Sequence, residues 1–157
     1  MGRTLSIVAL LVAFAALGLG GWLVVHPNAF RAAPGPSFTD AQRAEARTEA
    51  CQAYKTVSSG VFENTNRQSP GPPEDATAGM VVVANAKLAL LEGGQYLRAR
   101  TSPAAPADLA AAIARFSTAL MDIGAGANAG VVDNDPAQAE LFRNADAINT
   151  EIKALCP

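Results

Sequence analysis

The sequence is poor in the side chains on which most catalytic and metal sites depend. Its 157 residues include one histidine and two cysteines, and aromatic residues make up 6%. The histidine, His26, precedes the C-terminal domain, which excludes a histidine-dependent hydrolytic triad there. One histidine and two cysteines, with no CxxC pair, cannot supply a four-ligand zinc site without carboxylates, and no residues are spaced for one. We therefore expect no catalytic residues, no cofactor and no metal, and we interpret the protein as non-enzymatic.

Charged residues are also few and mixed in sign. The chain has 12 Lys and Arg against 14 Asp and Glu, for a net charge of −2. Acidic and basic residues are interspersed, and no basic run occurs. Because nucleic acids and anionic lipid headgroups are bound by positive surfaces, we expect neither to be the main ligand.

Two short motifs resemble ligand loops but do not fit them. Residues 124–134 (GAGANAGVVDN) are glycine-rich and are expected to form a loop, but no strand precedes them and no GxGxxG or GK[ST] spacing is present. A calcium loop beginning at Asp133 would need Gly at its sixth position and Glu at its twelfth, which is Asn144. Neither a phosphate site nor a calcium site is therefore expected.

The sequence does contain one long apolar run, residues 5–25. It holds no charge, and Ser6 is its only polar side chain. About 20 such residues are enough to cross a bilayer as a helix. A cleaved signal peptide is the alternative, but the run exceeds the usual length, and cleavage after Ala33 would place Arg31 and Pro34 at unfavourable positions. We expect the run to be retained as a transmembrane anchor in contact with the lipid bilayer.

The orientation of the anchor follows from the charges that flank it and from the cysteines. Arg3 and the α-amino group lie on one side and Arg31 on the other, a small bias toward a cytoplasmic N-terminus. Two cysteines beyond the anchor favour an oxidising compartment. We predict a single-pass protein of the cytoplasmic membrane: residues 1–4 are cytoplasmic, residues 26–38 form a Pro/Ala-rich linker, and residues 39–157 form an extracytoplasmic domain.

This domain has the periodicity of helices separated by Pro and Gly breaks. Thr39 and Gln42 have the spacing of a capping box, and Asp135 followed by Pro136 is typical of a helix start. Four helices are expected, at residues 39–66, 75–100, 105–124 and 136–155. Short connections between long helices predict an all-α fold: the N-terminal transmembrane helix followed by an antiparallel up-down four-helix bundle.

The second of these helices, residues 75–100, is apolar on nearly every side. We expect it to be the most buried helix of the domain, and Gly93-Gly94 to kink or weaken it. A second transmembrane span is the competing interpretation. Polar residues interrupt its apolar runs at Asn85, Lys87 and Glu92. Across the bundle, six apolar residues are expected to be buried together: Val83, Leu90, Phe116, Leu120, Leu141 and Ile148.

The two cysteines are placed to form one disulfide. Cys51 lies on the apolar face of the first helix, and Cys156 lies at the end of the apolar stripe of the last. In an up-down bundle the first and last helices are neighbours, so Cys51 and Cys156 are expected to pair. Two separate buried thiols in a reducing compartment are the alternative.

Several segments also carry a family resemblance. They are residues 50–61 (ACQAYKTVSSGV), 84–97 (ANAKLALLEGGQYL), 122–131 (DIGAGANAGV) and 154–156 (ALC). With the anchor and the Pro/Ala-rich linker, they make the chain resemble a group of mycobacterial and related actinobacterial single-pass membrane proteins that are rich in alanine and proline. The resemblance implies an actinobacterial cell envelope. It implies no activity and no functional residues.

These observations favour a binding module over an enzyme. We expect a membrane-tethered helical domain that interacts with another envelope or membrane protein. The alternative is a helical bundle that binds a lipid or another small apolar ligand. A pocket of roughly 300 Å³ or more, lined by Val83, Leu90, Phe116 and Leu120, would favour the ligand. A closed bundle with a bare apolar surface would favour the protein partner.

Overall fold

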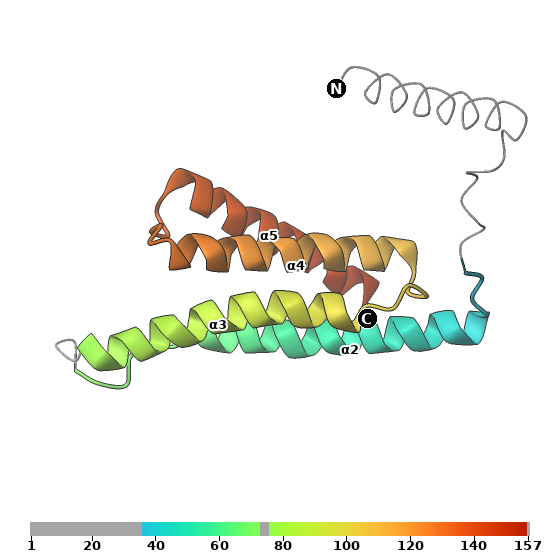
Figure 1. The fold of residues 1–157 in the computed structure, drawn as a ribbon, viewed down its shortest axis with the longest axis horizontal. Helices are drawn as coiled ribbons and strands as arrows, with labels where there is room; N and C mark the ends of the chain where they lie inside the picture. Colours follow the sequence, from blue (N-terminus) through green and yellow to red (C-terminus); the bar gives the residue numbers. More distant parts are fainter. Residues whose placement is uncertain (1–35, 73–75, 157) are drawn as a thin grey trace, which may run out of the picture. The chain divides into compact units, whose positions relative to one another are not determined.

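The computed structural model describes residues 36–72 and 76–156, and all the regular secondary structure within them is helical. Figure 1 shows four helices in chain order: α2 (Asp40–Thr65), α3 (Ala76–Arg100), α4 (Ala107–Asn128) and α5 (Pro136–Leu155). The expected all-α class is confirmed for this part of the chain. The apolar run at residues 5–25 and most of the linker lie outside the described residues.

The helix starts are set by local hydrogen bonds that the sequence predicts. Thr39 caps α2: its side-chain oxygen accepts from the Gln42 backbone N–H at 3.2 Å, and its own backbone N–H donates to the Gln42 side chain at 2.9 Å. Asp135 caps α5 by accepting from the Gln138 backbone N–H at 3.2 Å, and Pro136 is the first helical residue. Both predicted starts are confirmed by these hydrogen bonds. Each cap satisfies backbone N–H groups that have no partner inside the helix.

Gly93 and Gly94 do not break α3, which runs continuously from Ala76 to Arg100. They lie instead where α3 packs closely on its two neighbours. A methyl group on Gly93 would lie 2.8 Å from Cγ1 of Val57 on α2, and one on Gly94 would lie 2.7 Å from the backbone oxygen of Ser117 on α4. The expectation of a kink is therefore wrong, because the missing side chains allow close helix packing.

The glycine-rich segment also differs from its expected structure. Residues 124–134 were expected to form a loop, but α4 continues through Gly124 to Asn128. A methyl group on Gly124 would lie 2.9 Å from Cγ of Leu91, so this glycine also serves close packing. The turn follows the helix and contains Gly130, whose φ of 84° lies in the left-handed region that favours glycine.

The core forms around α4, and the expectation that the second helix is the most buried is wrong. Residues of α2, α3 and α5 all contact α4, whereas α3 packs mainly on α2 and α4. Among the six predicted core residues, four are buried: Leu90, Phe116, Leu120 and Ile148. Leu141 is partly buried, and Val83 is 53% exposed because no neighbouring helix covers it.

Two of the described helices, α3 and α4, are long and apolar enough to cross a membrane by length and composition alone. The most apolar 18-residue window of each has a mean hydropathy of 1.2. Half of this window is buried in α4, as expected of a core helix, but only 6% is buried in α3. Two helices with the same mean hydropathy therefore differ in how much of their apolar window is buried.

Candidate functional site

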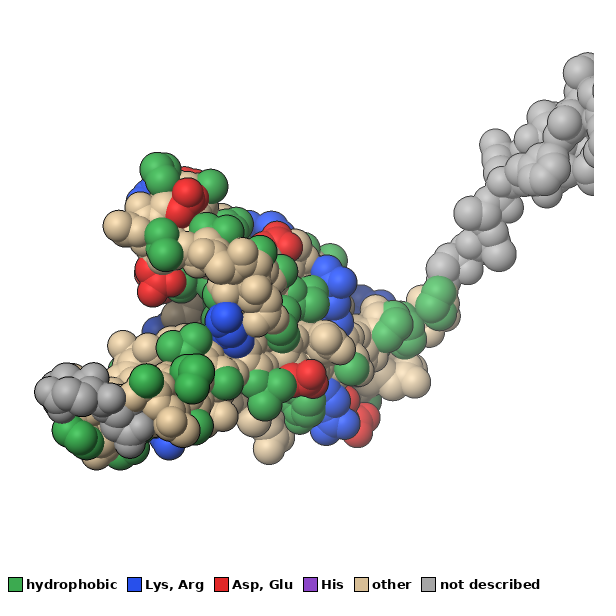
Figure 2. Space-filling model, turned by 60° about the vertical axis from the view of Figure 1, so that its left-hand side comes forward, with side chains coloured by type: hydrophobic (Ala, Val, Ile, Leu, Met, Phe, Trp, Pro, Cys, Tyr) green, Lys and Arg blue, Asp and Glu red, His purple; other side chains and the backbone are tan. Residues whose placement is uncertain are grey.

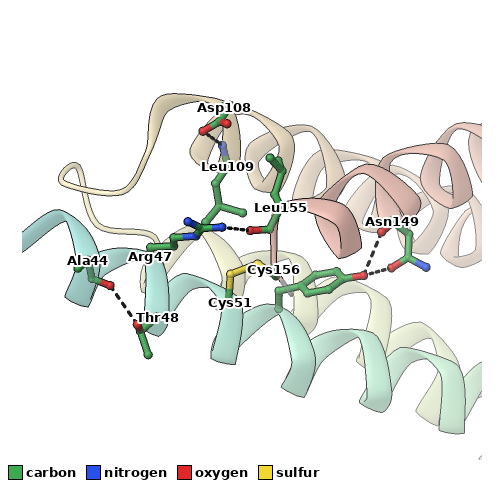
Figure 3. The surroundings of a disulfide bond; sticks show 10 residues. Ala44, Arg47, Thr48, Cys51, Asp108, Leu109, Asn149, Leu155 and Cys156 are labelled. Atoms are coloured by element: carbon green, nitrogen blue, oxygen red, sulfur yellow. Dashed lines mark hydrogen bonds between the residues drawn. A yellow bond between two sulfur atoms is a disulfide. The ribbon is translucent and has the colours of Figure 1, made fainter.

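The end of the bundle near the start of α2 is closed by the cysteine pair. Cys51 lies on α2 and Cys156 directly follows α5, with the two sulfur atoms joined and the Cα atoms 5.5 Å apart (Figure 3). This separation lies within the usual range of disulfides, about 4.4–6.8 Å. The structure thus brings together the two residues for which the sequence predicts a disulfide.

Hydrogen bonds between α2 and α5 extend this closed end. Arg47 donates from Nη2 to the backbone oxygen of Leu155 at 2.8 Å, which places a positive charge at the C-terminus of α5 (Figure 3). The Tyr54 hydroxyl donates to the backbone oxygen of Asn149 at 3.1 Å and also contacts the Asn149 side-chain oxygen. The Tyr54 ring packs edge-on against Phe116, with ring centroids 6.0 Å apart.

Tyr54 is the titratable group that this packing perturbs most clearly. Burial raises the pKa of its hydroxyl above the usual value of 10.0, and a hydrogen bond with Ser58 opposes part of that shift. The side chain is 3% exposed, so the phenolate form is disfavoured by desolvation. At neutral pH, Tyr54 is therefore a neutral donor that joins α2 to α5, which is a structural role.

The other buried polar side chains also have structural partners. Gln138 is 2% exposed, and its Nε2 donates to the backbone oxygen of Ile123 at 3.1 Å. The side chain fits against Gly126, where a methyl group would lie 2.5 Å from Oε1 of Gln138. Ser117 is fully buried and donates to the backbone oxygen of Ile113 at 2.7 Å. Within residues 36–72 and 76–156, every buried side-chain nitrogen and oxygen has a hydrogen-bond partner.

The acidic side chains do not form a metal site in the part of the chain that the structure describes. No three His, Cys, Asp or Glu residues lie together there in a way that could hold an ion. Two of the carboxylates form surface ion pairs, Glu151 with Arg115 and Glu140 with Arg143. Such exposed pairs contribute little to stability and mark no ligand site.

The opposite end of the bundle is open, with a cleft above the core. Beyond Tyr54 and Asn149, α2 and α5 leave a hollow of about 180 Å³ over α4, and an adjoining hollow of about 270 Å³ extends toward α3. Figure 2 shows the molecule hollowed between its two lobes at this end. The two hollows share Thr65, Leu90, Ile123 and Phe142.

This cleft includes the residues that the sequence assigned to an apolar pocket. Leu90, Phe116 and Leu120 line the smaller hollow, and Val83 lines the larger one with Leu90. Neither hollow alone reaches the size of a typical small-molecule pocket, about 300 Å³. Phe62, which stands at the edge of the smaller hollow, is 64% exposed. The cleft is therefore apolar but only partly enclosed.

The second candidate surface is the outer side of α3. Met80 is 64% exposed, Val81 55% and Leu88 56%. With Ala84 these side chains form one continuous apolar surface, which we call the outer face of α3. A shallow groove of about 700 Å³ runs along it and ends at Asn128 of α4. These side chains of α3 are left uncovered by α2 and α4, and exposed apolar patches of this kind are typical of interaction surfaces.

No family model, curated protein or solved structure matches the chain. The functional argument therefore depends on the cleft and on the outer face of α3. Sequence reasoning missed this face because it took an apolar helix to be a buried one. The signal was present: residues that are apolar on every side of a helix cannot all face a core of two neighbours.

Proposed function

We propose that this protein is a non-enzymatic, membrane-tethered module that binds another protein through the outer face of α3. In this proposal residues 1–4 are cytoplasmic, residues 5–25 span the cytoplasmic membrane once, and residues 26–38 link this anchor to the domain. The domain is an antiparallel up-down four-helix bundle outside the membrane. Its role is that of an accessory component of the cell envelope.

The exposure of α3 is the observation that carries the proposal. Met80, Val81 and Leu88 are each more than half exposed, while residues of similar size on α4, such as Ile113 and Leu120, are 1–2% exposed. Soluble surfaces rarely leave several large apolar side chains side by side, and such patches mark interaction sites. A partner that covered this face would gain the usual hydrophobic free energy of about 25 cal/mol per Å².

The cysteine pair supports the extracytoplasmic location. Cys51 and Cys156 lie at disulfide distance. Stable disulfides of this kind form in oxidising compartments and are rare in the cytoplasm of most organisms. An apolar run before a domain with such a pair is consistent with export of the domain and retention of the anchor.

Photocrosslinking in native membranes tests the binding surface. A photoreactive residue at Leu88 should yield a specific protein adduct that can be isolated and identified. The same residue at Ala147, an exposed position on α5, is the matched control and should yield no such adduct. Equal labelling from the two positions would contradict the proposal.

Two measurements test the topology. Mass spectrometry of the membrane-extracted protein should find an N-terminus before residue 5, so a mature N-terminus between residues 15 and 38 would disprove retention of the anchor. Protease added to intact spheroplasts should degrade the domain of residues 39–157. Full protection of the domain would disprove the orientation.

The cleft favours a second candidate function, the binding of a lipid or another apolar ligand. Its floor is apolar, with Phe116 and Leu120 beneath the smaller hollow. Ser58 lines this hollow, and its neighbour Ser59 is exposed outside it. If the cleft holds a ligand, Ser58→Trp should reduce the lipid that co-purifies with the protein, measured by mass spectrometry, and Ser59→Trp should not. Equal lipid content in the two variants would argue against this function.

A further inference from the structure

The sequence of α3 contains two apolar stripes on different sides of the helix. The inner stripe packs in the bundle and has spacings of four, three and four: Ala86, Leu90, Gly93 and Leu97. The outer stripe has spacings of three, four and three: Val81, Ala84, Leu88 and Leu91. Leu91 is half-buried because it lies against Gly124 of α4, at the edge of the outer stripe, and the other three are exposed. Spacings of three and four are those of positions a and d in a heptad, with Val81 and Leu88 at a and Ala84 and Leu91 at d.

We propose that the outer stripe of α3 pairs with the same stripe of a second copy of this chain, in parallel, to form a homodimer. This inference rests on the proposed function, because it names the partner that covers the outer face of α3. The β-branched Val81 at a and the small Ala84 at d suit a close two-helix contact. The interface is isologous, so each stripe meets its own copy across a two-fold axis.

The charges that flank the stripe determine its direction. Lys87 precedes Leu88 and takes position g, and Glu92 follows Leu91 and takes position e. In a parallel pair, position g of one helix faces position e of the other, five residues later, so Lys87 faces Glu92 of the partner subunit. An antiparallel pair would instead place position g beside position g and e beside e, so that like charges repel.

Both charged side chains are available for this contact. The two ion pairs found among residues 36–72 and 76–156 are Arg115–Glu151 and Arg143–Glu140, and neither includes Lys87 or Glu92. Glu92 is exposed, and Lys87 lies partly exposed along the groove on the outer face. By symmetry, the dimer would contain the Lys87–Glu92 pair twice.

The place at which the chain enters the bundle agrees with the parallel direction. After the end of α3, Ala104 packs against Ala46 of α2 and Phe38, so α3 ends near the point of entry. A two-fold axis along α3 therefore puts Phe38 of both copies at the same end. This arrangement suits two chains anchored in one membrane, and their shared membrane raises the local concentration of each for the other.

Cysteine crosslinking of the full chain in native membranes tests the pairing. Position a lies opposite itself in a parallel pair, so Leu88→Cys should form a covalent dimer on mild oxidation with copper phenanthroline. Tyr96→Cys is the matched control: Tyr96 is 42% exposed against 56% for Leu88, but it takes position b and does not line the groove on the outer face. Its dimer yield should be several-fold lower.

Charge reversal in the Leu88→Cys background tests the direction. Lys87→Glu and Glu92→Lys should each lower the crosslinked fraction, as expected for a dimer weakened roughly tenfold by two repulsive pairs. The double variant Lys87→Glu/Glu92→Lys should restore it. If the crosslinked fraction of the double variant stays low, the parallel register is overturned. Recovery in the double variant also excludes misfolding as the cause of the single-variant losses, because the second reversal would not repair a folding defect.

The products distinguish this inference from the proposed function. A covalent product of twice the chain's mass from Leu88→Cys supports self-pairing. An adduct of Leu88→Cys with a different protein would preserve the proposed binding face and overturn the homodimer. No product above the Tyr96→Cys level, together with no adduct from the photoreactive residue at Leu88, would overturn both.

Discussion

The two ends of the helical domain are built from similarly apolar helices but differ in how well they are closed. At one end Cys51 and Cys156 are joined, and Leu97 is fully buried. At the other end Phe62 and Met80 are each 64% exposed. Leu97 and Met80 belong to the same helix, so composition alone does not explain the difference. It depends on whether α2 and α4 lie against that part of the helix.

This difference shows that contacts between distant parts of the chain determine how much of an apolar helix is buried. Tyr54 and Asn149 join α2 to α5 near the disulfide, and beyond them the cleft separates the same two helices. The closed end therefore provides stability. The open end leaves apolar surface exposed, and the predictions below test this division.

The largest expected effect is the loss of the disulfide. Replacing Cys51 and Cys156 together by Ser should lower the free energy of unfolding by up to about 4–5 kcal/mol, the chain-entropy value for a loop on the order of 100 residues. The closed end would then, like the open end, have no covalent link between α2 and α5. Urea unfolding of the isolated domain, followed by circular dichroism, measures the change, and a loss under about 1 kcal/mol would show that the disulfide does not hold this end.

Truncations within α3 compare the two ends directly. Leu97→Ala should cost about 2–5 kcal/mol, as other large-to-small core substitutions do. Met80→Ala should cost less than about 0.5 kcal/mol, because its side chain is already in solvent. Urea unfolding of both variants should show this contrast. Equal losses would mean that Met80 is covered within the domain.

Glycine substitutions in the same helix test its packing. Gly94→Ala should destabilise the domain by about 1–3 kcal/mol, because the new methyl group would meet the backbone oxygen of Ser117. Gly79→Ala, near the open end, has no neighbour within 4 Å and should stabilise it by up to about 1 kcal/mol through helix propensity. Thermal unfolding should therefore shift in opposite directions, and a shift of the same sign in both would contradict this packing.

The smallest effect concerns Tyr54, whose pKa is raised by burial. The folded state holds this proton more tightly than the unfolded state, so the resulting stability is present below the unfolded pKa of about 10 and is lost as the pH rises through the folded value. Tyr54→Phe should cost about 1 kcal/mol at pH 8 through the lost hydrogen bond. The difference from the wild-type protein should shrink by pH 11.

Tyr96→Phe is the control for the lost hydroxyl. Tyr96 is 42% exposed on α3, so its substitution should change the stability at pH 8 by less than about 0.5 kcal/mol. The measurement is urea unfolding at intervals between pH 8 and pH 11. A constant difference between wild type and Tyr54→Phe over this range would disprove the role given to burial.

The sequence predicted the starts of α2 and α5 well because the signals for a helix start are local. The capping box at Thr39 and the Asp135-Pro136 start depend on residues within three positions of each other, so their effect needs no tertiary contact. The glycines were harder to interpret. Gly93, Gly94 and Gly124 lie within helices because neighbouring helices approach them, and a sequence read alone treats a glycine as a break.

The candidate binding surfaces were less predictable than the disulfide. Cys51 and Cys156 lie on the apolar stripes of the first and last helices, so the bundle topology was enough to pair them. Val83 also carries the spacing of a core residue, since it lies seven residues before Leu90, which is buried. Its exposure depends on where the neighbouring helices end, and spacing does not reveal that.

By itself, the sequence determined the all-α class, the helix starts and the pairing of Cys51 with Cys156, because caps and apolar periodicity act over short stretches. The tertiary structure alone decided which apolar helix is central. α4 is buried because the three other helices of the domain contact it, whereas α3 packs on α2 and α4 only and leaves Met80, Val81 and Leu88 exposed. Hydrophobicity favours burial, but the number of available neighbours limits which surfaces are buried.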